Sequence, residues 1–166
     1  MRRILGVDLG ERRIGLAIAD DDGGRALPLA TIRRTDDPAA DAAAIGRVVA
    51  EQEVVELVVG LPLHAGGDEG GQAELTRAWV AAVAPLLERP IVLRDERLSS
   101  HLAERRIGPM KRGRSGGPPT RTQREAWRAR VDREAAAIIL QDELDARAAN
   151  PGSGGTSTDD ARETPR

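Results

Sequence analysis

An acidic residue inside an apolar strand constrains this chain more than any other feature. Residues 4–9 read Ile-Leu-Gly-Val-Asp-Leu, a continuous apolar run apart from Asp8. Such a run is typical of a strand that is buried on both faces of a sheet. A carboxylate at that position costs folding free energy unless another group compensates its charge. The fold must therefore bring a compensating group to Asp8.

Two further strands are expected directly after the first. Residues 14–19 alternate a bulky and a small side chain, so the second strand has one bulky face and one small-residue face. The Asp-Gly pair at 22–23 predicts a hairpin into a third strand over residues 25–32. Pro28 places this third strand near an edge, because proline cannot donate to a strand ladder. These patterns predict an antiparallel meander.

Helices and strands alternate in the middle of the chain. Asp37 and Pro38 predict the start of a helix that continues to about residue 52, and residues 54–61 predict a strand. A second helix is expected around an apolar stripe formed by Leu75, Trp79, Val83 and Leu86. A short strand over residues 91–93 is expected next. Ser99 or Ser100 is expected to cap a short helix that ends near residue 107.

The last expected element is a long helix that begins after a Gly- and Pro-rich loop over residues 108–122. One face of this helix carries Trp127, Val131, Ala135 and Ile138. The order of three strands, helix, strand, helix, strand and two helices predicts an α/β domain over residues 1–149. Its mixed sheet has about five strands. Residues 150–166 are polar and rich in Gly, Ser and Thr, which predicts a disordered tail.

Composition excludes several classes of protein. The chain of 166 residues has no Cys, which excludes disulfides and thiolate metal sites. No apolar run approaches the length of a membrane span, and no charged segment leads into an apolar one as in a signal peptide. We therefore expect a cytoplasmic protein without a membrane partner.

The small net charge of −2 conceals a strong asymmetry. Residues 105–133 hold ten basic residues against Glu125 and Asp132, which gives this segment a charge of +8 and the rest of the chain −10. Such segregation attracts polyanions, among them nucleic acids. A solvated Arg-rich surface would show the same pattern, and this feature alone does not choose between the two interpretations.

Three acids stand at positions that structure alone does not favour. Asp8 lies in the first strand, Glu96 ends the fifth, and Asp132 lies on the last helix. The small residues Ala135 and Ala136 would let that helix approach the sheet and bring Asp132 toward Asp8. Convergence of three like charges costs stability, and Mg²⁺ or Mn²⁺ ions, which prefer carboxylate ligands, would remove that cost. Two such ions about 4 Å apart can support the hydrolysis of a phosphodiester bond.

Ordinary structural roles explain each acid on its own equally well. An Asp before Gly can cap a turn, and Glu96 can pair with its neighbours Arg94 and Arg97 at the surface. Asp132 can pair with an arginine on the same helix. The spacing of the acids alone does not decide between these roles and a metal site.

Four motifs occur in order along the chain. They are Asp-Leu-Gly with Arg-Ile-Gly-Leu-Ala in residues 8–17, Val-Gly-Leu-Pro-Leu in 59–63, Asp-Glu-Arg-Leu-Ser-Ser in 95–100 and Val-Asp-Arg-Glu-Ala-Ala in 131–136. Together they resemble the YqgF/RuvX family of bacterial pre-16S rRNA nucleases, which are similar to Holliday-junction resolvases. The resemblance extends over roughly residues 3–147 and is more specific than any single motif.

The resemblance implies an RNase H-like fold and a nuclease in which Asp8, Glu96 and Asp132 are catalytic and hold the metal ions. It implies processing of the 5′ end of pre-16S rRNA, with pre-rRNA or a pre-ribosomal particle as partner. Resolution of branched DNA, or a non-catalytic role in ribosome assembly, are the alternatives. An actin-like ATPase half would also begin with Asp-Leu-Gly, but a chain of this length has no room for its second half.

The candidate nucleic-acid contacts are basic residues near the acids or in the basic segment: Arg13, Arg97, Lys111, Arg112, Arg114, Arg128 and Arg130. Salt bridges that stabilise the fold would account for Arg13 and Arg97 equally well. The chain departs from the family pattern at residues 64–67, which read His-Ala-Gly-Gly where Asn and then Asp-Gly are common, and in a longer, more basic segment at 111–130. A monomer or weak homodimer is expected.

Overall fold

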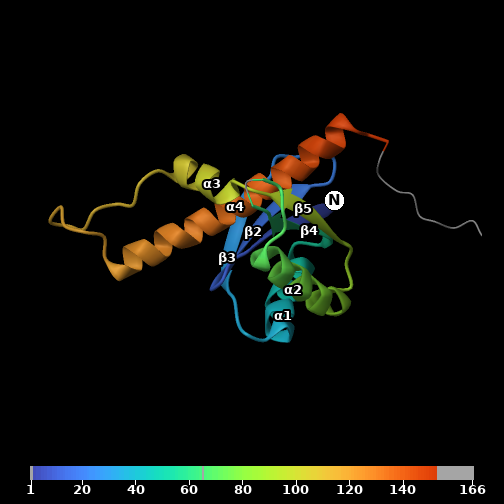
Figure 1. Cartoon of the computed structure of the whole chain (residues 1–166), viewed down its shortest axis with the longest axis horizontal. Coiled ribbons are helices and arrows are strands. Elements are labelled where there is room, and N and C mark those ends of the chain that lie inside the picture. Colours follow the sequence, from blue (N-terminus) through green and yellow to red (C-terminus); the bar gives the residue numbers. More distant parts are fainter. Residues whose placement is uncertain (1, 65, 153–166) are drawn as a thin grey trace, which may run out of the picture.

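A computed structural model describes residues 2–64 and 66–152 (Figure 1). Its elements are β1 (Arg3–Leu9), β2 (Arg13–Asp20), β3 (Leu27–Arg33), α1 (Pro38–Glu51), β4 (Val54–Pro62), α2 (Gly71–Leu87), β5 (Ile91–Glu96), α3 (Ser99–Ile107) and α4 (Arg121–Ala149). This is the predicted order of strands and helices. The expected disordered tail lies, from residue 153 onward, outside the described residues.

The five strands form one mixed sheet in the order β3-β2-β1-β4-β5. Strands β1, β2 and β3 are the predicted antiparallel meander, whereas β4 and β5 run parallel to β1. β3 lies at an edge, as Pro28 predicted. The predicted α/β architecture, a mixed sheet of about five strands flanked by helices, is confirmed. Because β1, β4 and β5 are parallel, their carboxyl ends meet at one edge of the sheet, where sites commonly form in such sheets.

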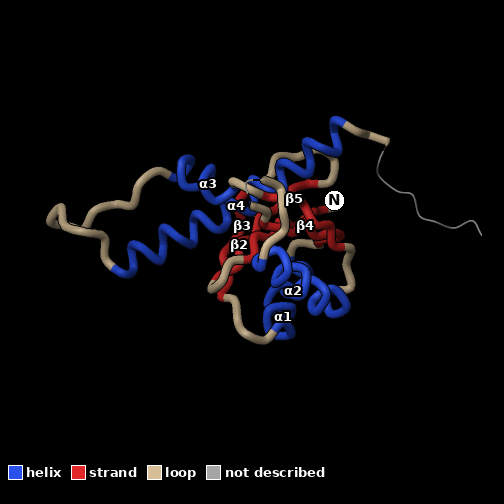
Figure 2. Tube along the Cα trace, in the orientation of Figure 1, coloured by secondary structure: helices blue, strands red, loops and turns tan. Residues whose placement is uncertain are grey.

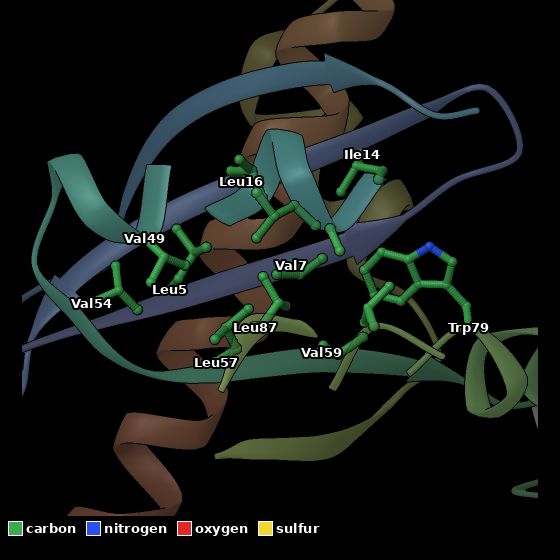
Figure 3. Close-up of a cluster of buried hydrophobic side chains, with 13 residues drawn as sticks. Leu5, Val7, Ile14, Leu16, Val49, Val54, Leu57, Val59, Trp79 and Leu87 are labelled. Carbon is green, nitrogen blue, oxygen red and sulfur yellow. The ribbon is translucent and has the colours of Figure 1, made fainter. Parts of the chain in front are cut away.

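Helices cover both faces of the sheet (Figure 2). The bulky residues of β1 and β2 face α1 and α2, where Leu5, Val7 and Leu16 pack with Trp79 in the larger core cluster (Figure 3). The small-residue face of β2 lies under α4, with Ala17 packed in a second cluster. The two faces predicted from the alternation in residues 14–19 are therefore present, and the small-residue face is the one that α4 covers.

The apolar stripe of α2 differs from the expected one. Trp79 and Val83 are buried, but Leu75 and Leu86 are 56% and 58% exposed. Residues at 73, 76 and 87 are buried in their place. Two stripes with helical spacing overlap in this segment and share Trp79 and Val83. The structure buries the stripe that starts with the smaller residues Ala73 and Thr76.

Helix α4 crosses the sheet over glycines. A Cβ atom added to Gly15 of β2 would lie 2.0 Å from the Asp132 carbonyl oxygen, and one added to Gly6 of β1 would lie 2.8 Å from the carbonyl oxygen of Ala136. The close approach therefore depends on the absence of side chains on the sheet. The expectation for the helix was half right: Ala136 packs on the sheet, whereas Ala135 packs on α3.

The predicted face of α4 around Trp127 and Val131 packs against Ala103 and Ile107 of α3. The first part of α4 and the loop over residues 108–120 extend away from the sheet (Figure 1). Among the described residues, no helix combines the length and apolar character needed to cross a membrane.

Substitution of Gly15 by Ala is expected to destabilise the protein by about 3 kcal/mol, because the new methyl group would overlap the backbone of α4. Gly46→Ala is the matched control, since a Cβ there meets its nearest neighbour at 4.0 Å within helix α1. The control should raise stability by up to about 1 kcal/mol. Urea denaturation measures both values. A Gly15→Ala protein as stable as the wild type would contradict the close contact.

Candidate active site

The sheet register places Asp8 and Glu96 on the same face and at the same edge. Ile4 of β1 packs under α4, and side chains of a strand alternate between faces, so Asp8 also points to the α4 side. Arg94 of β5 forms an ion pair with Glu143 of α4, so Glu96, two residues later, shares that side. Both acids stand at the carboxyl ends of their strands.

Asp132 comes to this edge from α4. Its carbonyl group lies against Gly15, and Gly15 is the cross-strand partner of Asp8. The glycine therefore determines how near the helix brings Asp132 to the end of β1. The structure brings together the three acids named from the sequence.

The negative charges of Asp132 and Glu96 act on the carboxyl group of Asp8. The pKa of Asp8 is raised to about 7, first by burial of the carboxyl group and then by the negative charges of Asp132 and Glu96. In the described part of the chain, the Asp8 carboxylate has neither a hydrogen bond nor an ion pair. No side chain of the described residues therefore compensates the charge of Asp8.

The two other acids are engaged by protein groups. Arg13 donates from Nε to Oδ2 of Asp132 at 2.5 Å, with both side chains partly buried. The carboxylate of Glu96 accepts a hydrogen bond from the backbone N–H of Ser99 and so caps helix α3. The expectation that Ser99 or Ser100 caps this helix is wrong. A carboxylate also interacts favourably with the helix dipole, and it replaces the serine hydroxyl here.

The donor set suits a hard divalent cation. Its three side chains are carboxylates, which Mg²⁺ and Mn²⁺ prefer, and Asp8 is a partly buried carboxylate without a partner. Within residues 2–64 and 66–152, however, no three His, Asp or Glu side chains already converge in a metal-binding arrangement. The residues fit by chemistry, and Asp132 and Glu96 must turn away from their present partners to act as ligands.

The structure separates the basic candidates into two groups. Arg13 and Arg128 line a cleft of about 460 Å³ together with Asp132. Arg97 is exposed, and its guanidinium group lies against Gly67 in the loop after β4. These three arginines are the candidates near the acids.

The other basic candidates lie farther from the acids. Lys111, Arg112 and Arg114 belong to the loop that extends away from the sheet. Arg130 is exposed on α4, and at 100° per residue it points about 160° away from Asp132. The structure therefore does not bring these four residues to the acids.

The structure also contains a hollow that the sequence did not indicate. It has a volume of about 830 Å³ and lies between the end of β4 and the start of α2, with Leu63, His64 and Leu75 in its wall. The backbone N–H of Leu63 donates to the carbonyl oxygen of Glu96 at 2.8 Å, which joins the hollow to the site. Leu75 is the residue that could have indicated this hollow, because its apolar side chain is exposed in the wall. The sequence pattern had instead placed Leu75 in the buried stripe of the helix.

Comparison with known proteins identifies the family. Residues 2–146 match the model of the family described as "RuvX: Holliday junction resolvase". The chain belongs to the RuvX family. The resemblance carried by the four motifs is therefore confirmed, and the family is one of nucleases.

Two relatives of this RuvX-family chain carry the name "Putative pre-16S rRNA nuclease". The one from Anaeromyxobacter dehalogenans (strain 2CP-1 / ATCC BAA-258) is 47% identical over 147 residues, which cover 88% of this chain and 98% of the relative. The one from Chloroflexus aurantiacus (strain ATCC 29366 / DSM 635 / J-10-fl) is 42% identical over 148 residues, which cover 89% and 90%. Among solved structures, "T. thermophilus RuvC in complex with Holliday junction substrate" is 17% identical with a TM-score of 0.48, covering 89% of this chain and 96% of that one.

The raised pKa of Asp8 predicts a pH-dependent cost in the metal-free protein. The folded state keeps the proton up to about pH 7, whereas the unfolded chain releases it near pH 3.8, as an ordinary aspartate does, so stability falls as pH rises between these values. Asp8→Asn removes this titration. The stability of the variant relative to the wild type should increase by roughly 2–3 kcal/mol between pH 5 and pH 8.

Urea denaturation in the presence of a chelator measures this difference. Asp36→Asn is the control, because Asp36 is exposed in the loop before α1, and its effect should not change between the two pH values. An Asp8→Asn effect that is equally independent of pH would contradict the burial of an uncompensated carboxylate.

Proposed function

We propose that residues 1–149 form a metal-dependent nuclease that hydrolyses phosphodiester bonds of structured nucleic acid at Asp8, Glu96 and Asp132. The observation that carries this proposal is Asp8, a partly buried carboxylate with a pKa raised to about 7 by burial and by two neighbouring acids. A divalent cation shared by the three acids compensates all of these charges at once. Membership of a nuclease family supports the same assignment.

Two bound Mg²⁺ or Mn²⁺ ions would supply an activated water and stabilise the departing oxygen of the phosphodiester. The chain supplies rigid positions for their ligands. Strand β1 fixes Asp8, the contact with Gly15 fixes the backbone of Asp132, and the end of β5 fixes Glu96. No side chain acts as a nucleophile in this mechanism.

Arginines around the acids bind and orient the substrate. Arg13 and Arg128 line the cleft at Asp132, and a guanidinium group can donate two parallel hydrogen bonds to a phosphate. Arg128 lies one helical turn before Asp132, about 6 Å along the axis of α4. It is therefore suited to hold a phosphate that neighbours the scissile one, and Arg97 can approach the same strand from the loop side.

The basic segment sets a minimum size for the substrate. Arg121, where α4 begins, lies about 16 Å along the helix axis from Asp132, and the loop with Lys111, Arg112 and Arg114 lies farther out. A substrate that contacts both the acids and this loop must be an extended polyanion with several phosphates. Such contacts are made mainly with the backbone, so the affinity falls steeply with salt.

We propose the 5′ end of pre-16S rRNA as the substrate, on the strength of the name shared by relatives that match nearly the whole of their own length. A four-way DNA junction is the second candidate, because the matching family model is described as a Holliday junction resolvase. Both are structured nucleic acids with closely spaced backbone phosphates, and the site chemistry is the same for both.

Cleavage assays on the two substrates test the proposal. The wild type should cut one of them in Mg²⁺ or Mn²⁺ and neither in a chelator. Asp8→Asn, Glu96→Gln and Asp132→Asn should each lower the rate about 100-fold or more, because each removes a ligand charge. Asp36→Asn should keep the wild-type rate, since Asp36 is exposed and outside the site.

Cleavage at the wild-type rate by Asp8→Asn would overturn the assigned roles. Tight, salt-sensitive binding of the precursor RNA without cleavage and without saturable binding of Mn²⁺ would favour a non-catalytic assembly factor instead.

A further inference from the structure

We propose that Arg13 is an exchange residue: in the resting protein it occupies Asp132, and it must leave this carboxylate before a divalent cation can bind there. A substrate phosphate in the adjoining cleft then binds the guanidinium group of Arg13 in place of Asp132. This inference rests on the proposed function. In this role Arg13 controls whether Asp132 is available to a cation. A salt bridge that only stabilises the fold, or a residue that only binds phosphate, would not have this effect.

The resting contact is short and direct. Arg13 Nε lies 2.5 Å from Oδ2 of Asp132, and the two side chains are 31% and 19% exposed. Arg13 begins β2, and Asp132 lies on α4, 119 residues later in the chain. In the described part of the chain, this is the one ion pair that Asp132 forms. A partly buried pair of this kind holds its partners more firmly than a fully exposed one.

The backbone at Asp132 cannot shift to accommodate a second partner. Its carbonyl oxygen is packed so tightly on Gly15 that a Cβ atom there would lie only 2.0 Å away. Rotation of the side chain is therefore the movement that can transfer the carboxylate from Arg13 to a cation beside Asp8. Arg13 and a metal ion compete for the same carboxylate.

Charge determines which partner prevails. Without a cation, a turn of Asp132 toward Asp8 and Glu96 would bring three carboxylates together, whereas its present position pairs it with the positive charge of Arg13. The ion pair with Arg13 is the lower-energy state of the metal-free protein. This explains why the acids are neighbours and yet, within residues 2–64 and 66–152, do not form a ready metal-binding cluster.

The cleft offers Arg13 an alternative partner. Arg13 lines it together with Arg128, and a phosphate bound there would meet two guanidinium groups. A phosphate that draws Arg13 away frees Asp132 for a cation, so substrate and metal binding are expected to strengthen each other. The free protein should accordingly bind divalent ions weakly, and the metal site is completed only when a substrate phosphate has engaged Arg13.

A Mn²⁺ titration followed by calorimetry, without nucleic acid, tests the competition. Arg13→Gln should bind Mn²⁺ about tenfold more tightly than the wild type, because Asp132 is released. Arg12→Gln is the matched control: Arg12 is exposed, belongs to the same turn and lines the same cleft, but forms no ion pair with Asp132. It removes the same charge and should change the affinity by about twofold at most.

Arg13→Lys provides a second variant if Arg13→Gln proves unstable by circular dichroism. It keeps the charge but loses the forked guanidinium group, and its Mn²⁺ affinity should lie between those of the wild type and Arg13→Gln. In a chelator, Arg13→Gln should bind the nucleic acid more weakly than Arg12→Gln. Arg13→Gln is thus expected to raise the metal affinity and to lower the nucleic-acid affinity.

Saturable Mn²⁺ binding by the wild type with equal affinities for Arg13→Gln and Arg12→Gln would overturn the inference and leave the proposed function standing. An Arg13→Lys affinity equal to that of the wild type, together with a stable Arg13→Gln that gains nothing, would overturn it as well. No saturable binding by any of these proteins would instead overturn the metal site itself.

Discussion

The close contact between helix α4 and the glycines of the sheet is the constraint on which the site depends. At Gly15 the backbone of the helix lies where a side chain would otherwise stand, and at Gly6 the same is true one strand further. This approach places Asp132 next to the strand partner of Asp8. A helix held farther away would leave Asp8 as an isolated buried acid and Asp132 as an ordinary surface residue.

The same contact makes the metal-free site electrostatically unfavourable. Burial and two neighbouring acids raise the pKa of Asp8 to about 7, so at neutral pH this carboxyl group resists ionisation. The protein relieves part of the conflict by engaging Asp132 with Arg13 and Glu96 with the N-terminus of α3. Strongly perturbed groups of this kind gather at functional sites, where the cost in stability is offset by ligand binding.

Local patterns predicted the elements of the fold well. The alternation in residues 14–19, the proline at position 28 and the Asp-Pro pair at 37–38 each depend on backbone geometry within a few residues. The structure agrees with all three. The sequence raised the approach of Asp132 to Asp8 only as a possibility, because the spacing of the acids alone did not distinguish a metal site from ordinary structural roles.

Features that depend on distant partners were not predictable from local patterns. The α2 segment contains two overlapping apolar stripes, and packing against α1 and the sheet decides between them. The side chain that caps α3 is Glu96, three residues before Ser99. The usual preference for serine at a helix N-cap had pointed to Ser99 or Ser100 instead. The pairing of Arg13 with Asp132 joins residues 119 positions apart. The sequence left a salt bridge and a nucleic-acid contact as equal interpretations of Arg13, and it did not indicate Asp132 as the partner.

A divalent cation is the proposed partner that compensates the charge of Asp8. Crystals of the protein soaked in Mn²⁺ and measured for anomalous scattering test this most directly. We expect at least one peak within about 2.2 Å of an Asp8 carboxylate oxygen, with Asp132 turned toward that peak and away from Arg13. Crystals in which no peak lies near Asp8, and in which Asp132 remains paired with Arg13 at saturating Mn²⁺, would contradict it.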